Sequence, residues 1–257
     1  MREKEGQVKS LDRALSILEE IVDSEKGLTI TELSKKVGLP KSTTHRLVSS
    51  LTSRGYIKYG LHDHRYRPGL KLFEIGSKVL NGLELRKEVH PFLEELREKT
   101  GETIHLAVLD EAEVIYIDKV ESPHTIRMYS KIGRKAPLHC TGLGKAILAF
   151  SPPEVFEKML EEKGLRRYTE NTITDPKELK EHLKKIRDIG YSIDDSEHEK
   201  DIKCVGGPIF DYTGELVAAF SISVPTMRLN EEKFEEFKRL VLEYSKKISK
   251  ALGYVKG

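Results

Sequence analysis

The feature that most constrains the fold is a pair of short helical patterns separated by the tripeptide Gly38-Leu39-Pro40. Thr29 is placed to cap the first helix, and Gly38 can end it because glycine readily adopts the left-handed conformation found after helix ends. The second helix is expected to begin near Pro40 or Lys41 and to stop at Gly55. This spacing predicts a helix-turn-helix, in which the second helix lies in the major groove of DNA.

A longer helix is expected before this motif and a hairpin after it. Residues 10–23 predict an amphipathic helix with Ser10 as its N-cap. Its expected inward stripe is Leu11, Ala14, Leu15, Leu18, Ile21 and Val22. Residues 56–59 and 65–67 predict two strands around the turn 60–64, so the hairpin forms the wing of a winged helix-turn-helix.

The second helix of the motif presents hydroxyl and cationic side chains away from the apolar positions that it buries. Such groups bond phosphates or base edges, and Arg46 can contact guanine through two hydrogen bonds. The expected DNA-contacting residues are Lys41, Ser42, Thr43, His45 and Arg46, with Arg65 in the wing. Basic residues outnumber acids over 41–67, which favours a polyanion partner, double-stranded DNA. A protein-interaction module remains the alternative, because winged helices also serve that role.

Composition excludes several other classes. The chain has 257 residues, 38% of them hydrophobic and 33% charged, which suits two globular domains. The longest nearly apolar stretch, 216–224, is too short to cross a bilayer, and the first residues carry no apolar leader segment. Two cysteines are too few for a disulfide scaffold. We therefore expect a cytoplasmic protein without a membrane partner.

The segment after the wing predicts a linking helix. Its apolar residues lie on more than one helical face, which is broader than packing within one domain requires. We expect this helix to contact a second copy of the chain, because major-groove readers of this size commonly pair as homodimers. The expected boundaries are 1–68 for the winged helix, 69–84 for the linking helix and 85–257 for the second domain.

The second domain is predicted to mix helices with antiparallel strands, an α+β fold. Asp175 and Asn230 are expected helix caps. The expected helices are 85–100, one entered from the loop at 138–142, 176–188 and 231–252. The expected strands are 104–109, 114–120, 126–130, 191–194, 205–210 and 216–224.

Several sequence motifs resemble those of a known protein family. The stretches GLPKSTTHRL, PLHCTGLGKAILA, TITDP, YSIDDSEHEKDIKCVGGPIFD and AAFSISVP occur in this order. Together, over residues 8–254, the chain resembles the IclR family of transcriptional regulators. The resemblance implies a transcriptional regulator with a GAF/PAS-like effector-binding domain and an antiparallel sheet. It also implies dimers, or dimers of dimers, and effectors that are small carboxylates, keto acids, sugar acids or aromatic acids. We expect a repressor, while the sequence leaves activation open as the alternative.

The resemblance also implies an effector site. The implied contacts are Thr141, Gly142, Asp194, Cys204, Ser221 and Ser223, with apolar wall from Leu138, Leu143 and Ile147. Two arguments from the residues agree with it. Ser221 and Ser223 share one face of a strand, and a loop entering a helix at Thr141 offers backbone N–H groups that suit a carboxylate. Asp201 stands where the family usually has glycine, which adds a carboxylate nearby.

Alternatives remain at this point. The serines could bond neighbouring backbone groups, and Cys204 could be a small buried hydrophobe. A metal-binding sensor or a small-molecule enzyme is the rival class, since the second domain contains metal-ligand residue types. No C-x-x-C or H-x-x-x-H spacing is present, so we expect no metal, no cofactor and no catalytic residue. The segment 142–145 is not a phosphate loop, because Ala146 stands where Ser or Thr would hold magnesium.

Overall fold

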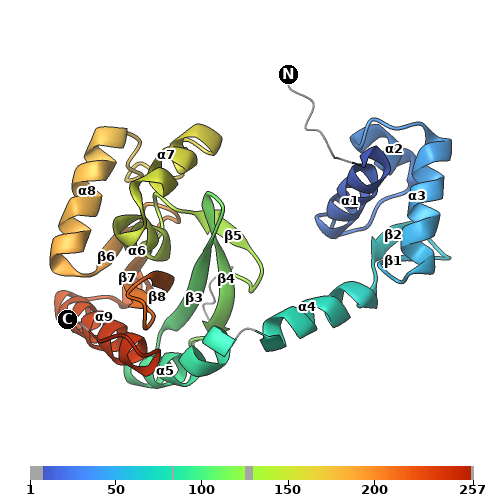
Figure 1. The fold of residues 1–257 in the computed structure, drawn as a ribbon. Coiled ribbons are helices and arrows are strands. Elements are labelled where there is room, and N and C mark those ends of the chain that lie inside the picture. The colour runs from blue at the N-terminus through green and yellow to red at the C-terminus, as the bar shows by residue number, and fades with distance from the viewer. Residues whose placement is uncertain (1–7, 83, 125–129, 256–257) are drawn as a thin grey trace. The chain divides into compact units, whose positions relative to one another are not determined.

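The computed structural model describes residues 8–82, 84–124 and 130–255. The chain divides into two compact units, residues 1–83 and 84–257 (Figure 1). Each unit has its own hydrophobic core. The expected strand at 126–130 falls outside the described residues, apart from Ser130, which is not in a strand.

The first unit contains four helices and one hairpin among its described residues. They are α1 (Lys9–Val22), α2 (Ile30–Lys36), α3 (Lys41–Ser53), β1 (Ile57–Tyr59), β2 (Tyr66–Pro68) and α4 (Leu70–Gly82). The two strands pair antiparallel, with Lys58 opposite Arg67. The winged helix-turn-helix and the helix that follows it are therefore confirmed.

Local chemistry explains where α2 begins and ends. The Thr29 hydroxyl accepts a hydrogen bond from the Glu32 backbone N–H at 3.3 Å, and the Glu32 carboxylate accepts one from the Thr29 N–H at 2.7 Å. This reciprocal capping box satisfies two N–H groups that have no partner inside the helix. Gly38 follows α2 with a φ of 64°. The expected cap at Ser10 is wrong, because α1 begins at Lys9 with Val8 in the cap position.

The predicted inward stripe of α1 is only partly right. Ile17 and Ile21 are the residues of α1 that are buried, and they pack with Leu33 and Val48. Half of the predicted stripe is exposed instead: Val22 at 50%, Leu11 at 57% and Leu15 at 45%. Helical spacing identifies apolar faces, but it does not say which of two faces packs on the core. This helix carries one apolar face inward and a second one outward.

The second unit is built around a six-stranded antiparallel sheet with the order β5-β4-β3-β8-β7-β6. The strands are β3 (Thr103–Asp110), β4 (Glu113–Val120), β5 (Lys135–Pro137), β6 (Ser192–Asp195), β7 (Ile202–Phe210) and β8 (Leu216–Pro225). The helices are α5 (Glu84–Thr100), α6 (Gly142–Phe150), α7 (Pro153–Glu162), α8 (Pro176–Ile189), the short η1 (Thr226–Arg228) and α9 (Glu231–Ala251). This confirms the α+β architecture.

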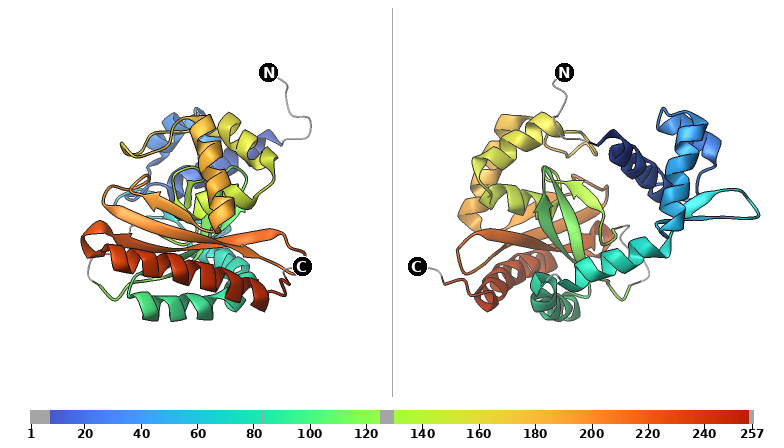
Figure 2. Two further views of the ribbon diagram at one scale, coloured as in Figure 1. Left: turned by 90° about the vertical axis from the view of Figure 1, so that its left-hand side faces the viewer. Right: turned by 45° about the vertical axis from the view of Figure 1, so that its right-hand side comes forward.

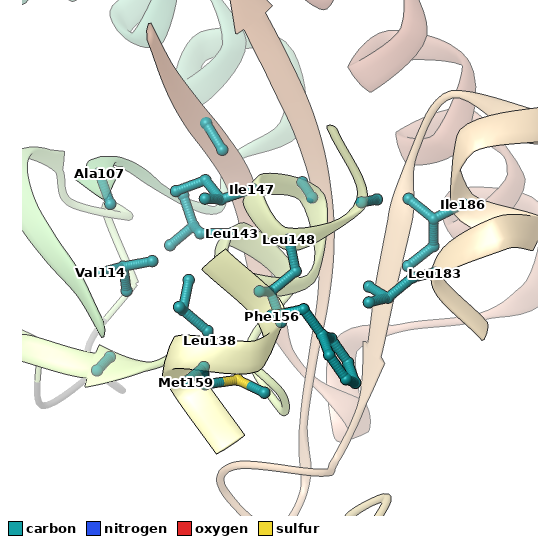
Figure 3. Close-up of a cluster of buried hydrophobic side chains, with 14 of the residues drawn as sticks. Ala107, Val114, Leu138, Leu143, Ile147, Leu148, Phe156, Met159, Leu183 and Ile186 are labelled. Carbon is teal, nitrogen blue, oxygen red and sulfur yellow. The ribbon is translucent and has the colours of Figure 1, made fainter. Parts of the chain in front are cut away.

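Helices cover both faces of the sheet. α5 and α9 lie side by side on one face, and α6 packs on the other together with α8 (Figure 2). Successive residues of β7 face opposite sides of the sheet: Gly206 packs against α6, whereas Gly207 packs against Val241 of α9. On the α6 side, Leu143, Ile147 and apolar residues of α7 and α8 form a continuous core (Figure 3).

Most expected elements of this unit are confirmed, including the caps. Asp175 accepts hydrogen bonds from two N–H groups of α8, and Asn230 accepts one at the start of α9. Three elements were not predicted: β5, α7 and the short η1. β5 is three residues long, too short for an alternating pattern to be recognised. β7 begins at Ile202, three residues before the expected start, after Asp201 in the left-handed region at a φ of 62°.

Candidate functional site

The helix α3 separates the expected DNA-contacting side chains from the core. Thr44 and Val48 are buried, whereas Lys41, Ser42 and His45 are exposed. Arg46 is also exposed, and Thr43 is half-buried. The structure thus places the predicted residues on the outer face of this helix. Contact between these side chains and DNA remains a prediction.

Arg65 lies differently from the expectation that it reaches DNA at the wing tip. Its guanidinium donates a hydrogen bond to the Gly27 carbonyl at 2.7 Å and forms an ion pair with Glu32 at 3.1 Å. These contacts hold β2 of the wing against the start of α2. Arg67 is also engaged, since it pairs with Asp63 across the turn and lowers the pKa of that carboxyl to about 2. Both wing arginines therefore have partners within the unit.

A buried cavity lies in the second unit between the sheet and the N-terminal end of α6. Seven of the nine residues predicted for the effector site line it: Thr141, Gly142, Leu143, Asp194, Cys204, Ser221 and Ser223. Six further residues, not predicted as effector contacts, complete the lining: His105, Tyr116, Ser130, His198, Glu199 and Ile202. Residues from five strands, from the start of α6 and from two loops thus meet at one place.

Leu138 does not line this cavity. It is 1% exposed and belongs to the apolar core beneath α6, as does Ile147 (Figure 3). The prediction of these two residues as cavity wall is therefore not supported. The apolar side of α6 packs toward α7 and α8, and only its first turn reaches the cavity.

Close backbone packing fixes the start of α6 at the cavity. A Cβ atom on Gly206 of β7 would lie 2.5 Å from the Gly142 carbonyl oxygen, so glycine is required at this crossing. The Ser192 hydroxyl donates a hydrogen bond to the same carbonyl at 2.5 Å. Thr141 caps the helix by accepting from the Gly144 N–H at 3.0 Å, while its hydroxyl donates to the Pro137 carbonyl. The first turn of α6 is therefore held firmly against the sheet.

The two predicted serines belong to a chain of polar groups. The Ser221 and Ser223 hydroxyl oxygens are 3.4 Å apart, and the Ser223 oxygen is 3.2 Å from Nδ1 of His105. Nε2 of His105 lies 2.6 Å from the Ser130 hydroxyl. Burial lowers the pKa of His105 to about 3, so the imidazole is neutral and can both donate and accept. These hydroxyls thus bond one another and His105, in place of the backbone bonds considered above.

Asp194 brings the cavity's buried carboxyl group. It is 3% exposed, and its Oδ1 accepts a hydrogen bond from the Glu197 backbone N–H at 2.7 Å. Burial raises the pKa of Asp194 to about 7. Cys204 lies opposite it on β7, where burial and the Asp194 carboxyl raise the pKa of the thiol. Both groups are therefore more readily protonated than in water.

A buried ion pair lies behind Asp194. The Lys145 ammonium of α6 donates to the Glu197 carboxylate, and both side chains are almost fully buried. His182 of α8 lies 3.4 Å from the same ammonium, and burial lowers the pKa of this imidazole to about 4. The pair ties α6 to the loop after β6. Sequence reasoning did not find it, because Lys145 looked like part of an unsuitable phosphate loop.

The cavity is small in this conformation. It leaves about 40 Å³ for the centres of water molecules, which is room for about three waters at roughly 10–15 Å³ each. A larger guest needs lining side chains to move apart. Within residues 8–82, 84–124 and 130–255, no group of three or more His, Cys, Asp or Glu side chains is arranged to hold a metal ion. Over the same ranges, no helix is long and apolar enough to cross a membrane.

A winged helix-turn-helix unit joined to an α+β unit with a buried polar cavity defines a class of protein, the helix-turn-helix transcriptional regulators with a separate second domain. Comparison with known proteins specifies the family. The family model for the IclR helix-turn-helix domain matches residues 10–60. The model described as bacterial transcriptional regulator IclR C-terminal matches residues 77–250. The chain belongs to the IclR family of bacterial transcriptional regulators.

Individual relatives agree along nearly the whole chain. The transcriptional repressor IclR of Escherichia coli is 41% identical over 250 residues, which are 96% of this chain and 91% of that protein. The crystal structure of the Thermotoga maritima IclR is 40% identical with a TM-score of 0.77, covering 96% of this chain and all of that one. An IclR homolog from Microbacterium hydrocarbonoxydans, complexed with 4-hydroxybenzoate, is 26% identical with a TM-score of 0.80, covering 95% and 98%.

Proposed function

We propose that this chain is a repressor whose affinity for double-stranded operator DNA is changed by a small carboxylate bound in the cavity at α6. The outer face of α3 is the DNA-reading surface, with Arg46 as a principal base contact. The E. coli relative is a transcriptional repressor, which supports repression. The complex of the Microbacterium homolog with 4-hydroxybenzoate supports an aromatic or other small acid as effector. No catalytic step is part of the proposal.

The observation that carries the proposal is the first turn of α6 at the cavity. Backbone N–H groups at a helix N-terminus have no partners within the helix, and the helix dipole favours negative charge there. Thr141 and Gly142 bring this end to the cavity lining, which the hydroxyl-bearing Ser221 and Ser223 share. A carboxylate between them would accept from the amides on one side and from the hydroxyls on the other.

We also propose that the chain works as a homodimer or a dimer of dimers in the cytoplasm, where operator DNA lies. Support comes from apolar side chains exposed in the first unit: Val8 just before α1, Leu11, Leu15 and Val22 on α1, and Leu70 and Phe73 on α4. Leu70 and Phe73 are 83% and 75% exposed. Clustered apolar exposure on a DNA-binding unit indicates a contact surface, and two copies would occupy two operator half-sites.

The test uses fluorescently labelled DNA from the region upstream of the protein's own gene. Anisotropy is recorded while pyruvate, lactate or 4-hydroxybenzoate is added to the complex. At least one carboxylate is expected to shift the operator affinity, and its uncharged amide is expected to have no effect at the same concentration. Binding of the DNA with no response to any of these acids would contradict the effector part of the proposal.

A further inference from the structure

The cavity that lies against α6 is unusual for an anion site because none of the residues described in its lining is Lys or Arg. The charged types that do line it are two acids, Asp194 and Glu199. Glu199 is exposed to water, whereas Asp194 is buried at the floor. A carboxylate entering here meets a carboxyl group before it meets a cation.

Two buried cations beside the cavity already have partners. Lys119 donates to the Ser130 carbonyl at 3.0 Å and pairs with Glu121 at 3.2 Å. Lys145 lies behind Asp194 and donates to the Glu197 carboxylate, so its charge already has a partner. The pair is neutral as a unit, and it does not line the cavity. Two carboxylates in the cavity would therefore repel each other in a low-dielectric site, because none of the residues described in its lining is a Lys or Arg that could lie between them.

The imidazoles, thiols and phenol around Asp194 are neutral near pH 7. Burial lowers the pKa of His105 on β3 and of His198 on the loop after β6, which keeps both imidazoles uncharged. On the neighbouring strands, burial raises the pKa of the Cys204 thiol and of the Tyr116 phenol. Burial likewise raises the pKa of the Cys140 thiol before α6. His182 faces Lys145 and is neutral as described above. None of these groups supplies a positive charge for a second carboxylate.

We propose that the cavity takes up its carboxylate effector together with one proton, which Asp194 holds as a carboxylic acid and donates in a hydrogen bond to the effector. This rests on the proposed function, because it presumes that a carboxylate binds in this cavity. No bond other than the O–H is made or broken: solvent supplies the proton on binding and takes it back on release. A carboxylic acid donating to a carboxylate is a short, strong hydrogen bond.

The chemistry of Asp194 in the free protein agrees with this role. Its carboxyl group has a pKa raised to about 7 by burial, so it stands half-protonated near neutral pH. A site of this kind binds an acid more tightly at low pH. With a free-site pKa of about 7, the protonated fraction falls from about ten elevenths at pH 6 to about one eleventh at pH 8. Effector affinity should therefore fall about tenfold over this range.

The experiment is calorimetric titration of the full-length protein with pyruvate, lactate and 4-hydroxybenzoate. Each is measured at pH 6 and pH 8 in two buffers with different ionisation enthalpies, which yields the protons taken up per ligand bound. The expected uptake is close to one proton at pH 8 and close to zero at pH 6, with about tenfold weaker binding at pH 8. An uptake near zero at pH 8 overturns the inference and leaves the proposed function standing. Absence of binding by all three acids at both pH values overturns both.

Variants test which side chain takes up the proton. Asp194→Asn keeps a neutral hydrogen-bond donor, so its binding is expected to vary less than threefold between pH 6 and pH 8 with no proton uptake. Glu199→Gln is the matched control, because it removes the exposed acid of the same cavity, and it is expected to keep the wild-type uptake. Proton uptake that persists in Asp194→Asn, or that disappears in His198→Gln, moves the proton to an imidazole and overturns the assignment. If Asp194→Asn does not fold, the proton uptake of wild type and of His198→Gln still tests the inference. Uptake near zero in wild type, or its loss in His198→Gln, overturns the assignment to Asp194.

Discussion

The guanidinium of Arg65 donates hydrogen bonds to the carboxylate of Glu32, with N–O distances of 3.1 and 3.3 Å. Glu32 is also the residue that completes the capping box of α2 with Thr29. The wing and the first helix of the helix-turn-helix are therefore joined through one side chain. This arrangement changes what is expected of Arg65, which the sequence alone placed on DNA.

Arg65→Ala should reduce the slope of the salt dependence of DNA binding, but by less than the loss of one phosphate contact would. An arginine that neutralises one phosphate contributes about 0.9 to the slope of log K against log salt, but Arg65 already shares its charge with Glu32. Anisotropy titrations at several salt concentrations measure the slope. A loss of about 0.9 would mean that Arg65 leaves Glu32 when DNA binds, in agreement with the sequence expectation.

Arg46→Ala should cost about 1–3 kcal/mol of specific operator binding, because a bidentate arginine contact to guanine is worth this much discrimination. Arg46 is exposed on α3, where a major-groove contact needs it. Binding to scrambled DNA of the same length should change much less. Arg54→Ala, just after the same helix, is the control and should weaken both DNAs alike. Equal losses on operator and scrambled DNA for Arg46→Ala would remove its role as a base reader.

Leu11→Gln combined with Leu15→Gln should weaken self-association of the full chain. Both leucines are exposed on α1, outside the core that Ile17 and Ile21 complete. The variant withdraws these two leucines from each protomer, and each is about half-exposed in the single chain. At the usual value for burial the dimer loses roughly 3–6 kcal/mol, and sedimentation velocity would show the shift in the dimer dissociation constant. Ile189→Gln, an exposed apolar residue of α8, is the control. An unchanged dissociation constant in the double variant would exclude α1 from the interface.

Whether a feature can be predicted from the sequence depends on how far apart along the chain its interacting residues lie. The caps at Thr29, Asp175 and Asn230 could be predicted because each side chain bonds backbone groups within three residues of itself. The face of α1 that packs inward could not, because that choice depends on where α3 lies. The same limit applies to Arg65, whose partner Glu32 is distant in the chain.

The cavity shows the same division. Ser221 and Ser223 could be paired from strand alternation alone, and Thr141 from its place before a helix. His105 was not predicted as a site residue, although its ring lies 3.2 Å from the Ser223 hydroxyl. These two residues are 118 positions apart, and strand order β3-β8 is what joins them. No local sequence pattern predicts that these two side chains lie next to each other.

Ser221→Ala with Ser223→Ala should weaken effector binding by about 1–3 kcal/mol, because acceptor atoms of the effector would lose hydroxyl partners in a buried site. Linkage requires the effector's influence on operator affinity to move to correspondingly higher effector concentration. The measurement is an effector titration of the operator complex. Ser245→Ala on α9, whose hydroxyl bonds the Pro208 carbonyl on the other face of the sheet, is the matched control. A double variant that responds at the wild-type concentration would place the effector elsewhere.

Asp194→Asn should stabilise the protein in a way that grows with pH, independently of any effector. The ordinary pKa of this carboxyl is 3.8, and burial raises it to about 7 in the folded state. Between these values the folded protein binds a proton that the unfolded chain has released, so the free energy of unfolding falls as pH rises and levels off above about pH 7.

Asparagine carries no such penalty and can still accept the hydrogen bond from the Glu197 backbone N–H. The advantage of Asp194→Asn over wild type should therefore increase by about 2–3 kcal/mol between pH 5 and pH 8, from 1.36 kcal/mol for each of the two pH units up to about 7. Urea unfolding of both proteins at several pH values measures this difference. Glu199→Gln, which removes an exposed acid, should show a nearly constant difference from wild type. A constant difference for Asp194→Asn as well would mean that Asp194 titrates in the folded protein as it does in water.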